Sequence, residues 1–246
     1  MNMTGRTTPS RAAALLLVAT LLTGCGGDDG QKKTAPKTPA ANSTSPPPTF
    51  TFENLRAALL PAKEVGADQR EIPVALESLK ERGIPMCSLS SIQLTGDPET
   101  MNRQFTNPAK GKDEVKYAQS IARFKSPAEA SKAYAKVQQK ARSCPAKQSV
   151  PQKRIRTNYV LLAHDDTWKV SEGSLVGWTH LRGTEKHVEP PSQTKYNVYH
   201  FMYDYALRGN IIVSSLYWER TEPKKSGEPV AKRATEVLTK QLRKIG

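Results

Sequence analysis

The sequence predicts an α+β domain, an antiparallel sheet with helices packed on it, after an export signal and a disordered N-terminal tether. Three observations support this class: a strand-to-helix junction in mid-chain, a series of strand patterns containing a hairpin signal, and an amphipathic helix at the end. Strands that follow one another through tight turns pair antiparallel, and flanking helices cover the sheet that they form.

Composition limits the class of protein further. The 246 residues include 37 Lys and Arg against 23 Asp and Glu, a net charge of +14, with 37% hydrophobic residues and three cysteines. These values exclude a multi-span membrane protein, a mostly disordered chain and a disulfide-built miniprotein.

Residues 1–24 have the pattern of a bacterial lipoprotein signal peptide. Two arginines precede an apolar run, Ala12–Leu22, which as a helix would cover roughly 17 Å of a ~30 Å hydrocarbon core. The run ends in Leu22-Thr23-Gly24-Cys25, which resembles the lipobox of bacterial lipoproteins. That resemblance implies cleavage before Cys25 and fatty acylation there, with palmitate as the typical chain. The alternative is an ordinary signal peptide followed by a chance cysteine.

Residues 25–49 comprise the expected lipidated cysteine and a tether. From Gly26 to Thr49 the tether has no Leu, Ile, Val, Met, Phe, Tyr or Trp. Such a segment buries too little apolar surface to offset its ordering entropy, so disorder is expected. The protein is therefore expected at the cell membrane, lipid-anchored on the extracytoplasmic face, with one α+β domain over 50–246.

The first half of the domain predicts two short helices and a strand. Apolar residues recur at helical spacing over 52–59 and stop before Pro61, and a second pattern over 74–79 is closed by Gly83. A strand is predicted over 115–124. A helix over 126–143 follows, with a capping box at its start formed by the Ser126 N-cap and Glu129.

The second half predicts strands and one closing helix. Strands are expected over 159–163, 167–170, 174–181, 196–206 and 211–218. An acidic turn, His164-Asp165-Asp166, would join the first two, and Leu207-Arg208-Gly209-Asn210 is a strong hairpin signal between the last two. A helix is expected over 229–245.

Two cysteines, Cys87 and Cys144, remain after acylation of Cys25. In an exported protein they most simply form a disulfide, which would close a 57-residue loop. Two free buried thiols are the alternative.

No motif of a known catalytic or cofactor site is present. The four histidines show no H-x-x-x-H spacing, so no zinc site is expected, and His164-Asp165-Asp166 reads more simply as an acidic turn than as a cation site. Nucleophile-elbow, P-loop and dinucleotide-binding patterns are absent from the sequence. We therefore expect no enzyme, no metal and no cofactor.

Two surfaces are candidates for binding. Aromatic residues gather in the strand region, where they serve either as core or as the lining of a ligand cleft: Trp178, Tyr203, Tyr205, Tyr217 and Trp218. Between residues 110 and 156 there are thirteen basic residues and three acidic ones. The candidate polyanion-binding residues in this segment are Lys132, Lys136, Lys140, Lys153, Arg154 and Arg156. A solvated surface is the alternative for the second set. An exported protein is not expected to meet nucleic acid.

Four short motifs stand out together: the stretch from Leu59 to Gly66, the Phe124–Ala130 junction, Cys144 after the helix and the Ala206–Val213 hairpin. In combination they resemble the extracellular sensor domain of mycobacterial receptor Ser/Thr kinases, which also occurs in actinobacterial lipoproteins. The resemblance implies an antiparallel sheet, packed helices and a ligand cleft. It departs from the family in allowing one disulfide instead of two, and in having no kinase domain or transmembrane helix.

Three functions follow as hypotheses. The first is a membrane-anchored lipoprotein whose sensor-like domain binds a small molecule, a lipid or an envelope component. The second is an interaction lipoprotein that binds an anionic envelope polymer or a protein through its basic face. The third, an envelope hydrolase, would require a buried Ser or Asp paired with a His.

Overall fold

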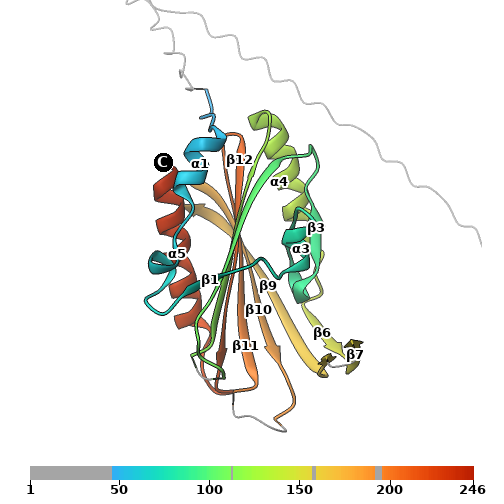
Figure 1. The fold of residues 1–246 in the computed structure, drawn as a ribbon. Coiled ribbons are helices and arrows are strands. Elements are labelled where there is room, and N and C mark those ends of the chain that lie inside the picture. The colour runs from blue at the N-terminus through green and yellow to red at the C-terminus, as the bar shows by residue number, and fades with distance from the viewer. Residues whose placement is uncertain (1–45, 112, 157–158, 192–195) are drawn as a thin grey trace, which may run out of the picture. The chain divides into compact units, whose positions relative to one another are not determined.

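The computed structural model describes residues 46–246 except 112, 157–158 and 192–195, and these build an antiparallel sheet with helices packed on it (Figure 1). The predicted α+β class is confirmed. Eight strands pair in the order β1-β4-β5-β12-β11-β10-β9-β6, each antiparallel to its neighbours. The predicted signal peptide, Cys25 and the predicted tether up to residue 45 lie outside the described residues.

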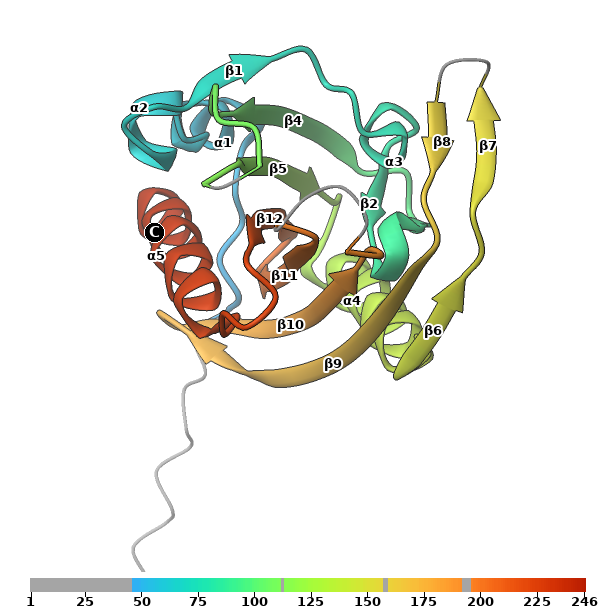
Figure 2. The same ribbon diagram turned by 90° about the horizontal axis from the view of Figure 1, so that it is seen from below.

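The elements have the following bounds. In sheet order the strands are β1 (Arg70–Ile72), β4 (Glu99–Thr106), β5 (Val115–Arg123), β12 (Ile211–Thr221), β11 (Val198–Arg208), β10 (Trp178–Val188), β9 (His164–Leu175) and β6 (Lys147–Val150). Two further pairs are β2 (Gly83–Pro85) with β3 (Ser91–Gln93), and β7 (Lys153–Arg156) with β8 (Tyr159–Leu161), which projects beside β6 (Figure 2). The helices are α1 (Phe52–Ala58), α2 (Ala62–Val65), α3 (Glu77–Lys80), α4 (Pro127–Arg142) and α5 (Glu228–Ile245), with a 3-10 turn η1 (Cys87–Leu89).

Helix α4 covers one face of the sheet. Its start is as predicted, because the Ser126 hydroxyl accepts a hydrogen bond from the Glu129 N–H. The other half of the capping box does not form, since Glu129 Oε2 is buried without a hydrogen bond. The end of α4 is fastened to the sheet by Trp168, whose indole N–H donates to the Ala141 carbonyl at 2.9 Å. The helix packs on the aromatic face of β11, formed by Tyr199, Phe201, Tyr203 and Tyr205.

Helices α1, α2 and α5 cover the opposite face, away from α4 and α3 (Figure 1). Alternate residues of β11 such as Met202 and Ala206 join the cores on this side, together with Leu238 and Leu242 of α5. Because both faces of β11 are covered, nearly the whole strand is buried. Among the described residues, no helix is long and apolar enough to cross a membrane.

Two predictions for the β9–β10 region are wrong. The expected strand over 174–181 is instead the hairpin between β9 and β10, with Val176 at φ 45° and Gly177 at φ 81° in its two-residue turn. Two successive positive φ values are what a type I′ turn requires, so the chain reverses there. The expected acidic turn over 164–166 is the first part of β9, where the side chains of His164 and Asp166 are buried.

The second predicted helix is shorter than expected. It begins at Glu77 instead of residue 74, and the residue in the left-handed region after it is Arg82, at φ 60°, whereas Gly83 begins β2. The helix therefore has one turn, and the chain leaves it directly into a strand that leads to Cys87.

The N-terminal end of the described chain is fixed to the β11–β12 hairpin. The Phe50 N–H donates to Asn210 Oδ1 at 2.8 Å, and the Asn210 amide donates to the carbonyls of Phe50 and Phe124. A Cβ on Gly209 would lie 1.8 Å from the Pro48 carbonyl oxygen, so only glycine allows this approach. The segment that leads into the domain thus enters at the hairpin end of the sheet.

Candidate functional site

A cavity of about 590 Å³ opens at the end of the sheet away from the β11–β12 hairpin, and we call it the aromatic pocket. The side chains that matter most in its lining come from β5, β10, β11 and β12 and combine rings with charges: Lys116, His187, Tyr199, Phe201, Trp218 and Arg220. A volume of this size falls within the ~300–1,000 Å³ of small-molecule sites, which are mainly apolar with a few polar groups.

Strand register places these rings together. Phe201 of β11 lies opposite Trp218 of β12, and Tyr199 lies opposite Arg220, so the four side chains share one face. The Lys116 ammonium lies 4.7 Å from the Trp218 ring centroid, and the Arg220 guanidinium carbon lies 4.6 Å from that of Tyr199. The cations therefore hold the rings in place as well as lending charge to the wall.

Several charged side chains of the aromatic pocket pair with one another. Glu114 lies 3.4 Å from Lys116 and 3.7 Å from Arg220, and Arg220 also lies 3.9 Å from Glu189. The Tyr199 hydroxyl donates to Glu189 at 3.1 Å. A ligand would therefore meet rings beside charges of both signs instead of a field of one sign.

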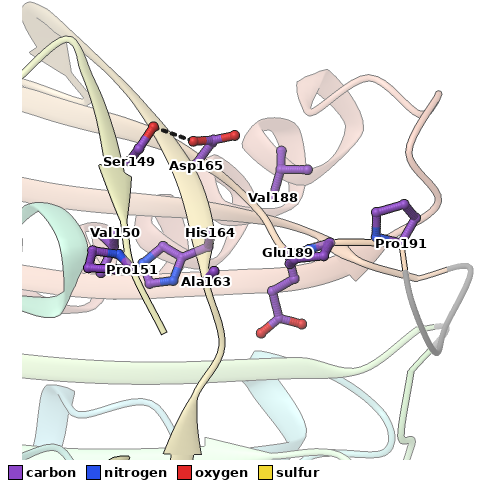
Figure 3. A pocket seen from close by; sticks show the side chains of 10 residues that line it. Ser149, Val150, Pro151, Ala163, His164, Asp165, Val188, Glu189 and Pro191 are labelled. Atoms are coloured by element: carbon purple, nitrogen blue, oxygen red, sulfur yellow. Dashed lines mark hydrogen bonds between the residues drawn. The ribbon is translucent and has the colours of Figure 1, made fainter. Parts of the chain in front are cut away.

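A second cavity, of about 550 Å³, lies at the neighbouring strand ends, and we call it the edge cavity (Figure 3). It is formed where β6, β9 and β10 end, by Ser149, Val150, Pro151, Ala163, His164, Asp165, Val188, Glu189, Pro190 and Pro191. Figure 3 shows the Ser149 hydroxyl donating to Asp165, at 2.5 Å. Glu189 lines both cavities, so the two adjoin at this residue.

His164, Asp166 and His187 lie between the two cavities, and we call them the open cluster. His164 lines the edge cavity and His187 the aromatic pocket, with buried Asp166 between them. His187 Nδ1 lies 2.9 Å from Asp166 Oδ1, and His164 Nε2 lies 3.6 Å from Asp166 Oδ2. The two imidazole rings are 4.1 Å apart between centroids. The alternative of a cation site at His164-Asp165-Asp166 includes two members of this cluster, but sequence spacing does not point to His187, which joins them only when β9 and β10 pair.

Ser88, in the loop that follows Cys87, contacts the open cluster and the neighbouring Glu185. Its N–H donates to Glu185 Oε2 at 2.5 Å and its hydroxyl donates to Asp166 Oδ2 at 2.8 Å. Ser88 and Leu89 both have left-handed backbone, at φ 51° and 53°, which non-glycine residues adopt at a cost in energy.

Burial and these contacts shift the acidities of the two carboxyl groups. Burial raises the pKa of Glu185 to about 7, and the charge of Asp166 adds to that rise. For Asp166, burial acts to raise the pKa, but hydrogen bonds from His187 and Ser88 and the imidazole charges outweigh it and lower the pKa. Asp166 is therefore charged at neutral pH, whereas Glu185 is partly protonated there.

The Cys87–Cys144 disulfide is present, with the two Cα atoms 6.3 Å apart, as the sequence predicted. It joins η1 to the chain just after α4. Because Ser88 follows Cys87 directly, the disulfide also holds the loop that reaches Asp166 and Glu185.

A second His–Asp cluster, which we call the closed cluster, lies on the α5 side of the sheet. Asp204 Oδ1 accepts from His180 Nε2 and from Arg182 Nε, both at 2.7 Å, and Oδ2 accepts from Arg182 Nη2 at 2.9 Å. Arg182 also donates to the Thr235 hydroxyl and the Ala231 carbonyl of α5. Its guanidinium occupies the space beside the carboxylate.

The predicted ligand-binding aromatics are mostly interior. The side chains of Trp178, Tyr203, Tyr205 and Tyr217 are buried, whereas Trp218 is partly exposed and lines the aromatic pocket. The alternation of strand residues puts Tyr199 and Phe201 on one face with Tyr203 and Tyr205, but these two rings, which line the pocket, are not among the predicted ligand-binding residues.

The predicted polyanion-binding residues divide between two elements. Lys132, Lys136 and Lys140 are exposed along α4, and Lys153 and Arg154 are exposed on β7, to which the backbone of Arg156 also belongs. None of the three helix lysines forms an ion pair with another described residue.

Comparison with known proteins finds structures that are similar at low sequence identity. No protein family model matches the sequence, and no curated protein matches it. The extracellular domain of PknH from Mycobacterium tuberculosis is similar at 12% identity and a TM-score of 0.45, over 80% of this chain and 98% of that one. A structure from Bacteroides thetaiotaomicron gives 12% identity and a TM-score of 0.27, over 71% of this chain and 41% of that one. Function is therefore argued from the site alone.

Proposed function

We propose that the protein is an extracytoplasmic lipoprotein, anchored through Cys25, whose sensor-like domain binds a small molecule, a lipid or an envelope component in the aromatic pocket. The observation that carries the proposal is the pocket itself: a space of about 590 Å³ lined by the partly exposed Trp218 ring, the largely buried Tyr199 and Phe201 rings, and charged side chains of both signs. A packed core would fill such a space, because interiors hold few voids larger than a water molecule.

The chemistry of the wall favours a compact ligand with a flat or apolar face and a few polar groups. Trp218 offers ring surface, and Glu114 and Arg220, which are partly exposed, offer hydrogen bonds. Stacking on rings contributes affinity, and the polar groups fix orientation.

Native mass spectrometry of the purified full chain tests the proposal by looking for a co-purified molecule. We expect a bound species in the wild type, and its loss in Trp218→Ala, which removes the ring from the pocket wall. Val176→Asn, in the β9–β10 turn and outside the lining, is the control and should retain the species. An unoccupied wild-type protein that also binds nothing from envelope extracts would contradict the proposal.

The anchor has its own test. Mass spectrometry of the membrane fraction should show an acylated Cys25 at the mature N-terminus, and Cys25→Ala should leave the protein uncleaved. An unmodified Cys25 in mature protein would overturn the anchoring.

A second candidate function is binding of an anionic envelope polymer along α4. The observation that favours it is the row Lys132, Lys136 and Lys140, four residues apart and without ion pairs to other described residues. Replacing all three with Gln should weaken polymer binding, and wild-type binding should fall as salt rises. Binding that ignored salt would contradict this function.

A further inference from the structure

We infer that the open cluster, His164, Asp166 and His187, is a binding site for Zn²⁺. One donor atom from each of the three residues lies within 4.8 Å of the others. Two imidazoles and a carboxylate are a ligand set that suits zinc. The inference rests on this cluster and is independent of what occupies the aromatic pocket.

The distances between the histidine nitrogens and the Asp166 oxygens can be compared with those between ligands of a zinc ion. Two donors ~2.1 Å from a tetrahedral zinc ion lie ~3.4 Å apart. His164 Nε2 and Asp166 Oδ2 are 3.6 Å apart, and His187 Nδ1 and Asp166 Oδ1 are 2.9 Å apart. The two distances end on different oxygens of Asp166, and the three donor atoms lie within 4.8 Å of one another, so the side chains must draw closer to bind one ion.

The groups behind the donors are already in place. His164 Nδ1 lies 2.8 Å from the Leu162 carbonyl and must donate to it, so Nε2 of the neutral ring carries a free lone pair toward Asp166. Metal-bound histidines usually donate their second N–H to an oxygen such as this carbonyl, which fixes the orientation of the ring. The Asp166 carboxylate is held as well, because the Ser88 hydroxyl donates to its Oδ2.

His187 requires one proton to move. Without metal its Nδ1–H donates to Asp166, and on zinc binding the metal replaces this proton at Nδ1. The neutral ring then carries its proton on Nε2, which faces Glu189 Oε1 at 3.8 Å. Glu189 lies near this nitrogen but beyond hydrogen-bond distance, and no net proton is lost from the ring.

Local charge also favours a cation. Asp166 and Glu185 are both buried and interact electrostatically. Among the residues that the structure describes, neither forms an ion pair with a lysine or an arginine. The closed cluster differs in this respect, because Arg182 already fills the place beside Asp204. The two cavities on either side of the open cluster give an ion a route in.

The test uses the full chain without a polyhistidine tag. Bound metal is removed with a chelator, Zn²⁺ is added back, excess is removed by dialysis, and the Zn²⁺ that stays bound is measured. We expect about one Zn²⁺ per chain by elemental analysis, a Zn²⁺-dependent rise in the thermal midpoint, and a visible absorption band with Co²⁺ in its place. Mg²⁺ and Ca²⁺ should give no such rise, since they prefer oxygen ligands.

Variants assign the ligands. His164→Gln and His187→Gln should lower Zn²⁺ affinity at least as much as loss of an outer hydrogen bond does, ~10–100-fold. Ser88→Ala should lower it within that range. His180→Gln removes a histidine from the closed cluster and should leave Zn²⁺ binding unchanged.

Two results would overturn the site. One is a wild-type chain that retains no Zn²⁺ and gives no Co²⁺ band, which would leave a hydrogen-bonded cluster only. The other is undiminished binding in folded His164→Gln and His187→Gln, with folding checked by circular dichroism. Should these variants fail to fold, the wild-type Co²⁺ spectrum still decides, because imidazole and carboxylate ligands give a band that surface adsorption does not.

Discussion

The open and closed clusters use the same chemistry on opposite faces of one sheet, yet they are built differently. Each has a buried aspartate that contacts histidine, but Asp204 is held by both arms of Arg182 and covered by α5, whereas Asp166 is held by two imidazoles and a serine between two cavities. A guanidinium satisfies a carboxylate permanently. Imidazoles and a hydroxyl can exchange partners, so the open cluster can take a ligand and the closed one cannot.

Removing the charge of Asp204 and of Asp166 in separate variants should distinguish the two clusters most clearly. Asp204→Asn should lower the free energy of unfolding by about 3–5 kcal/mol, because it leaves the Arg182 charge without its partner. Asp166→Asn should cost about 1–3 kcal/mol, the range for a buried hydrogen-bond partner. Denaturant unfolding measures both. Equal losses would show that the open cluster is as structural as the closed one.

The disulfide should matter to one cluster more than to the other. Replacing Cys87 and Cys144 with Ser should cost about 4 kcal/mol for the 57-residue loop in the chain-entropy model. Amide exchange should rise at Ser88 and Leu89 above the global change, because the disulfide holds their loop over Asp166. Exchange that rose equally around Asp204 would contradict this link.

The closed cluster should also give the fold a sensitivity to acid. Burial tends to raise the pKa of Asp204, but the His180 hydrogen bond and the Arg182 charge lower the net value below 3.8. A carboxyl with a lowered pKa stabilises the folded state above its unfolded pKa, and this contribution is lost as pH falls through the folded value.

Unfolding experiments between pH 6 and pH 2, values chosen as roughly spanning the carboxyl range, measure this loss. The decline should be shallower in Asp204→Asn than in the wild type. Tyr117 and Tyr205, the other titratable groups near Asp204, remain neutral throughout because burial raises their pKa. An unchanged slope in the variant would place the acid sensitivity elsewhere.

The smallest effect is expected at the turn that joins the strands carrying both clusters. Val176 has φ 45°, which a β-branched residue adopts at a cost, and Gly177 follows it. Val176→Asn should stabilise the fold by about 1 kcal/mol, since Asn-Gly is the favoured type I′ pair. The gain should be the same in Asp166→Asn and Asp204→Asn. A different gain in the two backgrounds would show that the turn is coupled to one cluster.

Local signals predicted much of the fold. Ser126, Pro127 and Glu129 define the start of α4, and Gly209-Asn210 defines the β11–β12 turn, because each depends on neighbours in sequence. The closing helix was also recognised from its own periodicity. These elements needed no knowledge of what they pack against.

The open cluster could not be found in that way. His164 and His187 meet because β9 and β10 pair in a register that places Asp166 opposite His187. The turn at Val176-Gly177 sets that register, and predicting one continuous strand across it leaves β9 and β10 unpaired. Asn or Asp is the usual residue at the position of Val176, so the sequence does not signal the turn. With the turn known, the pairing of the two strands would place the three residues together.

The attachment of Phe50 to Asn210 fixes where the described chain enters the domain. Strands β11 and β12 run 11 residues from this attachment to the cavities, or ~36 Å at the usual rise for an antiparallel strand. The entry of the chain and the openings of both cavities therefore lie at opposite ends of the same two strands, so a ligand could reach either opening without displacing the segment at Phe50.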